Sequence, residues 1–268
     1  MGEDYVGDYV REYDRRMDVL LRTFGADDTQ LREQLMAPLG LQRGARVLET
    51  GCGTCRDTRH LAARAGRVIA TDLSGDMIRG GRAAMAGGPE IDRVRFCVSD
   101  AIALPFRSGA FDAAYHFGGL NLFSNITQGI AEMARVVKPG GRVVVGDEGL
   151  APWLADSEFG KILLNSNPLY RHQPPLGQLP ISAREVTCRW ILNGAFYVID
   201  FTVGEGEPFL DLDVEFPGAR GGSHRTRYYG KLDGVAPELR QQAVDAAARE
   251  GVSLTAWLDR TLRRALQK

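Results

Sequence analysis

Two glycines and two acidic residues stand at spacings that could bind a ligand. Gly51 and Gly53 follow an apolar segment, and Asp72 ends the next apolar segment, 23 positions after Glu49. Glycine lets the backbone approach a ligand at a place where a Cβ would occupy the ligand's space. A carboxylate at the end of a strand can accept hydrogen bonds from two hydroxyl groups at once. The spacing therefore predicts a crevice for a ligand that carries a ribose.

Other roles for the same residues are less favoured. Asp72 could cap the following helix, although Ser74 is a good competitor for that position. A dinucleotide fingerprint, GxGxxG, that starts at Gly51 would need a glycine at position 56, where the chain has Arg56. The glycine turn therefore disfavours NAD as the ligand.

The cysteines do not indicate a metal or a disulfide framework. There are four, and no secretion signal accompanies them. Cys52 and Cys55 have the CxxC spacing of a redox pair or of half a zinc site, but no second CxxC or HxxxH follows to complete four ligands. We expect small residues in a tight turn and no bound metal.

The elements that must hold these residues alternate along the chain. Residues 5–24 carry apolar side chains at three- and four-residue spacings, which indicates an amphipathic helix, and a second helix is expected over 28–38. Strand and helix then take turns, which implies crossover connections and a parallel sheet. The expected strands are 45–50, 67–72, 94–100, 111–117 and 142–148, and the expected helices are 56–65, 74–86 and 126–137.

An antiparallel hairpin is expected to close the sheet. Two β-rich segments, 184–192 and 195–203, are separated by Asn193 and Gly194. This dipeptide favours positive φ and is typical of a two-residue hairpin turn.

Several motifs occur in the order found in one enzyme family. The acidic residue and the spaced glycines at 49–53 come first, with Cys55 where a third glycine is common. VIATDLSGDMI, VSDAIALPF, FDAAYHFGG and MARVVKPGGRVVVGDE follow. Together they resemble the class I S-adenosylmethionine-dependent methyltransferases over about residues 45–150, and the hairpin at 185–203 resembles the last two strands of that family. The resemblance implies an α/β fold, a Rossmann-like and mostly parallel seven-stranded sheet with a terminal antiparallel hairpin.

The resemblance also implies a cofactor and the residues that hold it. S-adenosyl-L-methionine would lie against the glycine turn, with its ribose on Asp72 and its adenine amino group near Asp100. Glu49 would order the loop and the ligand's ammonium group, to which His116 to Gly118 would offer backbone carbonyls. The cofactor-binding residues expected in this way are Tyr13, Glu49, Gly51, Gly53, Asp72, Leu73, Met77, Asp100, Ala101, His116 and Phe117.

The fourth motif bears on the methyl acceptor. Enzymes that act on exocyclic or amide nitrogens often carry D/N-P-P-Y/F there, whereas this chain reads YHFGGLNLF. ALPF, FDAAYHFGGLNLF and RVVKPGGRVVV are similar instead to the methyltransferases of quinone biosynthesis, which implies a small-molecule acceptor. His116 is the expected catalytic proton acceptor, because imidazole titrates near neutral pH; a structural histidine is the alternative. The residues expected at the acceptor are Tyr9, Asn121, Glu148 and Trp153.

Residues 223–268 differ from the rest of the chain in net charge and in the module that they resemble. Arg220 to Lys268 carries a net charge of +5, against −6 for residues 1–219. The segment resembles the ribbon-helix-helix module, with a strand in HRTRYYGKL and helices in PELRQQAVDAAARE and SLTAWLDRTLRRAL. Such modules are obligate dimers because one strand and two short helices cannot bury a core alone. The shared core would be Leu239, Ala247, Leu254, Trp257, Leu258 and Leu262.

Two functions from different classes are compatible with this plan. The first is a homodimeric enzyme that methylates a small metabolite. It would consist of a methyltransferase domain over 1–204 with an N-terminal helical lid, a linker over 205–222 and a dimerisation module over 223–268. The alternative is a DNA-binding regulator that senses S-adenosylmethionine, with the basic strand in the major groove. Dimerisation is preferred over DNA binding. The arginines of the strand do not decide between the two, because such arginines occur in both kinds of module. The strand residues concerned are His224, Arg225, Arg227 and Tyr229.

Composition favours a globular protein of the cytoplasm. The 268 residues are 44% hydrophobic, which is enough for a substantial core. No apolar run approaches the roughly 20 residues that a spanning helix needs, and the first residues, MGEDYVGDYV, are acidic rather than a basic leader. We therefore expect no membrane partner.

Overall fold

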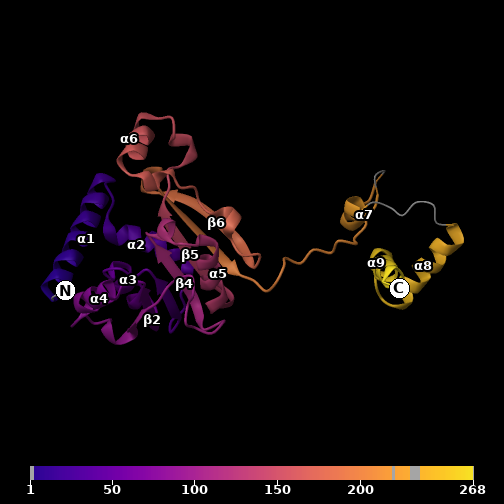
Figure 1. Cartoon of the computed structure of the whole chain (residues 1–268), viewed down its shortest axis with the longest axis horizontal. Coiled ribbons are helices and arrows are strands. Elements are labelled where there is room, and N and C mark those ends of the chain that lie inside the picture. Colours follow the sequence, from indigo (N-terminus) through magenta and orange to yellow (C-terminus); the bar gives the residue numbers. More distant parts are fainter. Residues whose placement is uncertain (1–2, 219–220, 230–235, 268) are drawn as a thin grey trace. The chain divides into compact units, whose positions relative to one another are not determined.

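The protein divides into two compact units in the computed structural model, Met1–Pro208 and Phe209–Lys268 (Figure 1). The structure describes residues 3–218, 221–229 and 236–267. None of the helices in these ranges has both the length and the apolar composition that a membrane crossing requires.

Seven strands form one sheet in the described part of the first unit. They are β1 (Arg46–Thr50), β2 (Arg67–Asp72), β3 (Val94–Val98), β4 (Phe111–Phe117), β5 (Val137–Glu148), β6 (Ala183–Ile191) and β7 (Phe196–Val203). Their order is β3-β2-β1-β4-β5-β7-β6. The strands from β3 to β5 pair in parallel, whereas β7 runs antiparallel to β5 and β6. The expected mostly parallel sheet with a terminal antiparallel hairpin is confirmed.

Helices cover both faces of this sheet. They are α1 (Glu3–Thr23), α2 (Asp28–Met36), α3 (Arg56–Arg64), α4 (Gly75–Met85), α5 (Ile126–Val136) and α6 (Glu158–Ser166). Val47 and Val68 belong to one buried cluster, whereas their chain neighbours Leu48 and Ile69 belong to another. A parallel sheet needs this double cover because its strands are apolar on both faces. Figure 1 shows α1 on the outside of the unit, where it contacts α4.

The connection from α5 to β5 is shorter than the sequence predicts. The proline and glycines of KPGG end the helix as expected, but β5 already begins at Val137. The register then jumps from Phe111 opposite Val137 to Ala113 opposite Arg142, so residues 138–141 bulge out of the ladder.

The turn between β6 and β7 is longer than the predicted two residues. Ile191 pairs with Phe196, so residues 192–195 form the loop. Asn193 does take a positive φ, 55°, and its side-chain amide donates to the carbonyl of Phe24 at 3.4 Å. This contact with the end of α1 favours the wider loop. The local sequence of a hairpin contains no information on such a contact with a distant element.

The second unit contains α7 (His224–Tyr229), α8 (Pro237–Arg249) and α9 (Leu254–Leu266). Two of these are the predicted helices, but the strand predicted in HRTRYYGKL is wrong for residues 224–229, and the rest of that segment lies outside the described residues. The backbone N–H of Thr226 donates to Ser223 Oγ at 3.3 Å, and that of Ser223 donates to Thr226 Oγ1 at 2.8 Å. These caps stabilise a helical turn, whereas a strand would need a neighbouring strand for its backbone groups.

Candidate functional site

The glycine turn joins β1 to α3 at the carboxyl edge of the sheet. Gly51, Gly53 and Cys55 have φ values of 65°, 52° and 66°, in the left-handed region that favours glycine. A Cβ at Gly53 would meet nothing within 4 Å, so the backbone there faces open space. Cys55 is buried, and a Cβ on Gly81 of α4 would collide with its sulfur. The thiol is therefore packed against α4.

Asp72 ends β2 beside this turn. Its Oδ2 accepts a hydrogen bond from the Gly53 N–H at 2.9 Å, and its Oδ1 accepts from the Ser74 N–H at 2.8 Å. Ser74 is the cap of α4, because its Oγ accepts from the Met77 N–H at 3.3 Å. The structure thus brings Asp72 and the glycine turn together and leaves helix capping to Ser74.

An apolar rim continues this edge of the sheet. Leu73 is 71% exposed and Val98 is 56% exposed. Val98 lies opposite Asp72 in the β2–β3 register. Val98 is not among the predicted residues, because a valine at the end of a strand resembles any buried strand residue until its exposure is known. Of the further predicted residues, Met77 lies in the first turn of α4, and Asp100 and Ala101 follow the end of β3.

Two predicted residues are buried beneath the turn. Glu49 accepts from Thr58 Oγ1 at 2.6 Å, and burial raises the pKa of its carboxyl well above the ordinary value. His116 Nδ1 lies 2.8 Å from the carbonyl oxygen of Thr50, and a Cβ on Gly51 would lie 3.0 Å from His116 Cε1. Burial lowers the pKa of His116, which is 1% exposed. Both side chains support the turn from below, and this burial argues against His116 as the proton acceptor.

Helix α1 is attached directly to the glycine turn. Thr54 Oγ1 donates to Asp14 Oδ1 at 2.7 Å. Arg56 donates to Asp18 Oδ1 at 2.8 Å and to the carbonyl oxygen of Asp14 at 3.2 Å. Because these donors follow Gly53 immediately, any movement of α1 is coupled to the turn.

Two tyrosines of α1 are predicted at the site. Tyr13 is the chain neighbour of Asp14, and burial, followed by the charges of Asp57 and Glu148, raises the pKa of its phenol. The residue is still 36% exposed. The side chain of Tyr9 lies outside the described residues.

Asn121 links the ends of β4 and β5. Its N–H donates to Asp147 Oδ2 at 2.5 Å, and its side-chain amide donates to the carbonyl oxygen of Glu148 at 2.8 Å. The Tyr197 hydroxyl donates to Asn121 Oδ1 at 3.2 Å. The amide is therefore engaged within the protein, and its contacts position β5. Trp153, in contrast, is an exposed residue.

Aromatic side chains meet near the end of β4. Phe196 lies 5.9 Å from Phe117, 5.9 Å from Tyr170 and 6.1 Å from Phe24, measured between ring centroids. Of the four, only Phe117 is predicted from the sequence. The other three come from segments far apart in the chain, so no local pattern groups them.

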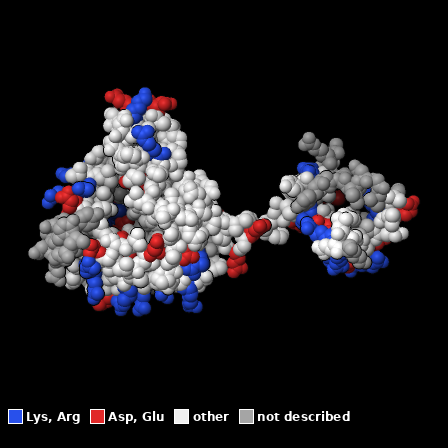
Figure 2. All heavy atoms as spheres, in the orientation of Figure 1, with Lys and Arg blue, Asp and Glu red and all other residues white. Residues whose placement is uncertain are grey.

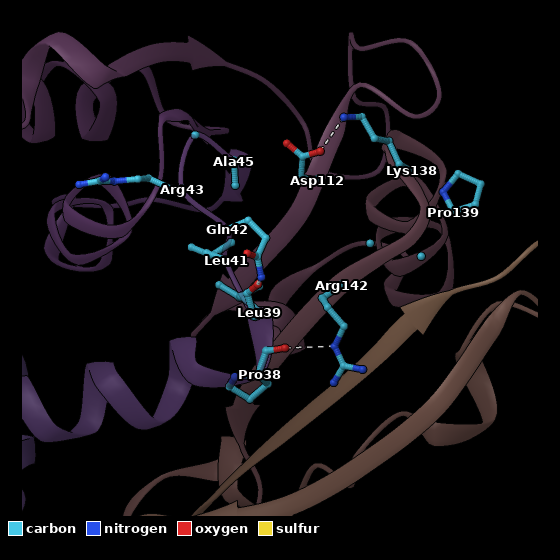
Figure 3. A pocket seen from close by; sticks show the side chains of 14 residues that line it. Pro38, Leu39, Leu41, Gln42, Arg43, Ala45, Asp112, Lys138, Pro139 and Arg142 are labelled. Atoms are coloured by element: carbon cyan, nitrogen blue, oxygen red, sulfur yellow. Dashed lines mark hydrogen bonds and ion pairs between the residues drawn. The ribbon is translucent and has the colours of Figure 1, made fainter.

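A cavity of about 730 Å³ lies at the other end of the sheet (Figure 3). Two of the cations that line it are already paired. Lys138 Nζ lies 2.5 Å from Asp112 Oδ1, and Arg142 donates to the carbonyl oxygen of Pro38 at 3.0 Å. Ala45, which also lines the cavity, precedes β1. The cavity is thus separate from the glycine turn, which follows β1.

Part of the first unit is similar to known proteins. Residues 47–141 match the family model of a methyltransferase domain. This stretch of the chain is similar to a methyltransferase domain. Relatives include the demethylmenaquinone methyltransferases of Beutenbergia cavernae, 37% identical over 146 residues, and of Desulfitobacterium hafniense, 32% identical over 145 residues. The matches cover 54% and 52% of this chain, and the chain spans 57% of the length of each relative.

Solved structures share the fold of the first unit. The YcgJ protein of Bacillus subtilis has a TM-score of 0.50 at 16% identity, over 65% of this chain and 98% of its own. A geranyl diphosphate C-methyltransferase from Streptomyces coelicolor A3(2), solved with Mg²⁺, geranyl diphosphate and S-adenosyl-L-homocysteine, has a TM-score of 0.50 at 18% identity. That match covers 66% of this chain and 77% of the other. The Rossmann-like fold of the domain is confirmed.

Proposed function

We propose that this chain is an S-adenosylmethionine-dependent methyltransferase that acts on a small-molecule acceptor. The observation that carries the proposal is the Asp72 carboxylate beside the glycine turn, with open space in front of Gly53. A bound S-adenosylmethionine supplies a methyl group on a positively charged sulfur. What remains for the protein is to align the acceptor with that methyl group and to exclude water.

The residues at the carboxyl edge fit this cofactor. Asp72 would accept hydrogen bonds from the two ribose hydroxyls, since a carboxylate offers two oxygens. The exposed apolar surfaces of Leu73 and Val98 would contact the adenine ring, and Asp100 would accept from its amino group. Tyr13 and the attached helix α1 would cover the methionine end. Glu49 and His116 would act by supporting the turn.

The acceptor that fits best is an aromatic hydroquinone. The relatives named above are demethylmenaquinone methyltransferases. Phe117, which is half-buried at the end of β4, would contact a flat ring system, and the buried rings of Phe24, Tyr170 and Phe196 would support it from behind. We therefore propose a naphthoquinol as the substrate class.

Titration with S-adenosyl-L-homocysteine tests the cofactor site. Asp72→Ala should weaken binding on the order of a hundredfold, because two hydrogen bonds to a charged acceptor are lost. Asp76→Ala, four residues further along in the first turn of α4, is the matched control and should bind like the wild type. Unchanged affinity in Asp72→Ala would remove the ribose contact and with it the proposal.

The partner that we propose for the second unit is another copy of this chain. Ala247 is buried, but Leu239 and Leu262 of the predicted shared core are 56% and 44% exposed. A second copy could cover these side chains. No observation favours the DNA-binding alternative, and on the face of the first unit drawn in Figure 2 basic and acidic side chains are mixed rather than gathered into a basic surface.

Sedimentation of the full chain tests the dimer. Wild type should sediment as a dimer, and the double substitution Leu239→Glu with Leu262→Glu should yield a monomer, because four carboxylates would enter the shared apolar contact. Phe209→Glu changes a residue that is 95% exposed and should leave the dimer intact. A monomeric wild type at micromolar concentration contradicts the proposal.

A further inference from the structure

Cys52 and Cys55 are free cysteines at the two ends of a four-residue turn. The Cys55 N–H donates to the carbonyl oxygen of Cys52 at 2.8 Å, which closes the turn. Such a turn keeps its first and last Cα atoms less than about 7 Å apart, and a disulfide needs about 4.4–6.8 Å. Cys52 is 6% exposed and Cys55 is fully buried, and both side chains belong to the same apolar cluster. The backbone therefore holds the two thiols close enough to be bridged.

The surroundings of Cys55 favour a reactive thiolate. Cys55 is the N-cap of the nine-residue helix α3, and the N-terminus of a helix stabilises negative charge. Its φ is 66°, so a cysteine at this position costs backbone energy that a glycine would not. The hydrogen bond from Cys52 is the largest cause that lowers the pKa of the Cys55 thiol, and Thr58 and Arg59 act in the same direction against the effect of burial.

The turn is open on the side of Gly53. A Cβ added to Gly53 would meet nothing within 4 Å, and Cys52 stands between two glycines that have no side chains to cover it. On the opposite side the Cys55 sulfur is packed against α4, because a Cβ on Gly81 would collide with it. A molecule as small as hydrogen peroxide can therefore approach the turn from the side of Gly53, where the proposed function places the cofactor.

We propose that Cys52 and Cys55 are a redox-sensitive pair, which a peroxide oxidises to a disulfide, and that the disulfide weakens cofactor binding. The effect on the cofactor rests on the proposed function, whereas the oxidation does not. One thiol attacks a peroxide oxygen and the O–O bond breaks, which yields a sulfenic acid and one water. The second thiol displaces the hydroxyl group as another water and forms the S–S bond. The pair loses two hydrogens with their electrons, and the peroxide takes up both.

Closing the bridge moves the residues that hold the candidate site together. The sulfur atoms of a disulfide are about 2 Å apart, which is closer than two thiols can lie without a bond, so the residues between them must shift. These are Gly53, whose N–H donates to Asp72 Oδ2 at 2.9 Å, and Thr54, whose Oγ1 donates to Asp14 Oδ1 at 2.7 Å. The disulfide should therefore strain both the bond to Asp72 and the bond to α1.

Peptide mapping of the full chain tests the oxidation. Trypsin should release residues 47–56, VLETGCGTCR, which contain both cysteines. After treatment with hydrogen peroxide, denaturation and alkylation, this peptide should carry no alkyl group and be two hydrogens lighter than the unalkylated dithiol. Treatment with dithiothreitol before alkylation should restore the alkylation of both thiols.

Two variants control for the other thiols. Cys97 and Cys188 lie on β3 and β6, the two edge strands of the sheet, so they cannot bridge to each other. Cys97→Ser with Cys188→Ser should give the bridged peptide as wild type does, and Cys52→Ser should not. A wild-type peptide that is alkylated on both cysteines, or that gains oxygen without a bridge, overturns the proposal.

Calorimetric titration with S-adenosyl-L-homocysteine tests the effect on the cofactor site. Oxidised wild type should bind on the order of tenfold more weakly than the reduced protein, which corresponds to the loss of about one hydrogen bond. Dithiothreitol should restore the affinity, and peroxide should leave the affinity of Cys52→Ser with Cys55→Ser unchanged. By linkage, saturating ligand should raise the midpoint reduction potential of the pair by about 30 mV, the equivalent of tenfold for two electrons. If reduced wild type fails to bind, the proposed function fails, whereas a bridged protein with unchanged affinity overturns only the effect of the disulfide on the site.

Discussion

Gly51 and Gly53 share a left-handed backbone but differ in what lies next to them. The imidazole of His116 lies directly behind Gly51, whereas Gly53 faces open space. The first glycine is therefore needed for packing, and the second leaves room for a ligand. The surroundings also matter for Glu148, because burial and the neighbouring Asp147 raise the pKa of its carboxyl.

The two glycines should respond differently to alanine. Both substitutions cost roughly 1–2 kcal/mol for a left-handed alanine, but Gly51→Ala should lose about 1 kcal/mol more, because its Cβ would crowd His116. Gly53→Ala should weaken binding of S-adenosyl-L-homocysteine by at least tenfold at little further cost in stability. Urea unfolding without ligand, together with calorimetric titration, separates the two effects. Equal losses of stability would mean that the His116 side chain moves to make room for the added Cβ at position 51.

The raised pKa of Glu148 should make stability depend on pH. A carboxyl whose pKa rises from 4.5 to about 8 on folding holds its proton more tightly in the folded state. Its contribution is fully present below pH 4.5 and is lost as pH rises through about 8. The Tm of wild type should therefore fall more than that of Glu148→Gln between pH 6 and pH 9. Parallel Tm curves for the two proteins would contradict the shifted pKa.

Helix α1 is the element whose position the glycine turn controls most directly. Its bonds come from Thr54 in the turn and from Arg56, the first residue of α3. Hydrogen bonds between side chains of this kind are worth about 1 kcal/mol each. Each bond therefore contributes a small part of the free energy that holds the helix on the turn.

Loss of one such bond should loosen α1. Asp14→Ala removes the acceptor of Thr54 and should increase deuterium uptake over residues 12–23, while weakening S-adenosyl-L-homocysteine binding about three- to tenfold. Glu12→Ala is the control, because the partner of Glu12 is Arg16 on the same helix. Equal uptake in the two variants would show that the bond to the turn does not hold the helix.

At the scale of the whole molecule, the two units differ in how complete their cores are. The first unit encloses large side chains such as Leu48, Phe111 and Tyr115. In the described part of residues 236–267, Ala247 is the buried residue. A unit without a core of its own gains stability by association, whereas the first unit does not depend on it.

A truncation after Pro208 should separate cofactor binding from association. Residues 1–208 should bind S-adenosyl-L-homocysteine within about twofold of the full chain, because the contacts of the glycine turn described above lie within them. The fragment should sediment as a monomer. Calorimetric titration and sedimentation check the two expectations, and a dimeric fragment would move the association surface to the first unit.

The local sequence determines the elements and the turn of the candidate site. Alternating apolar segments specify the strands, Ser74 specifies the start of α4, and paired glycines specify a left-handed turn, because each depends on residues within a few positions. Spacing along the chain then places Asp72 at the end of β2, next to the turn. The boundaries of β5 and of the hairpin turn depend on bulges and on distant contacts, which a local pattern does not contain.

Only the tertiary structure decides which residues are buried and which are neighbours. His116 and Glu148 are both polar residues near strand ends, yet the imidazole of His116 is enclosed under Gly51, whereas Glu148 is half-buried. Residues 224–229 form a helix through the caps of Ser223 and Thr226, although their composition suits a strand. Burial, pKa and partner choice depend on segments brought together from across the chain, so they arise only when it folds.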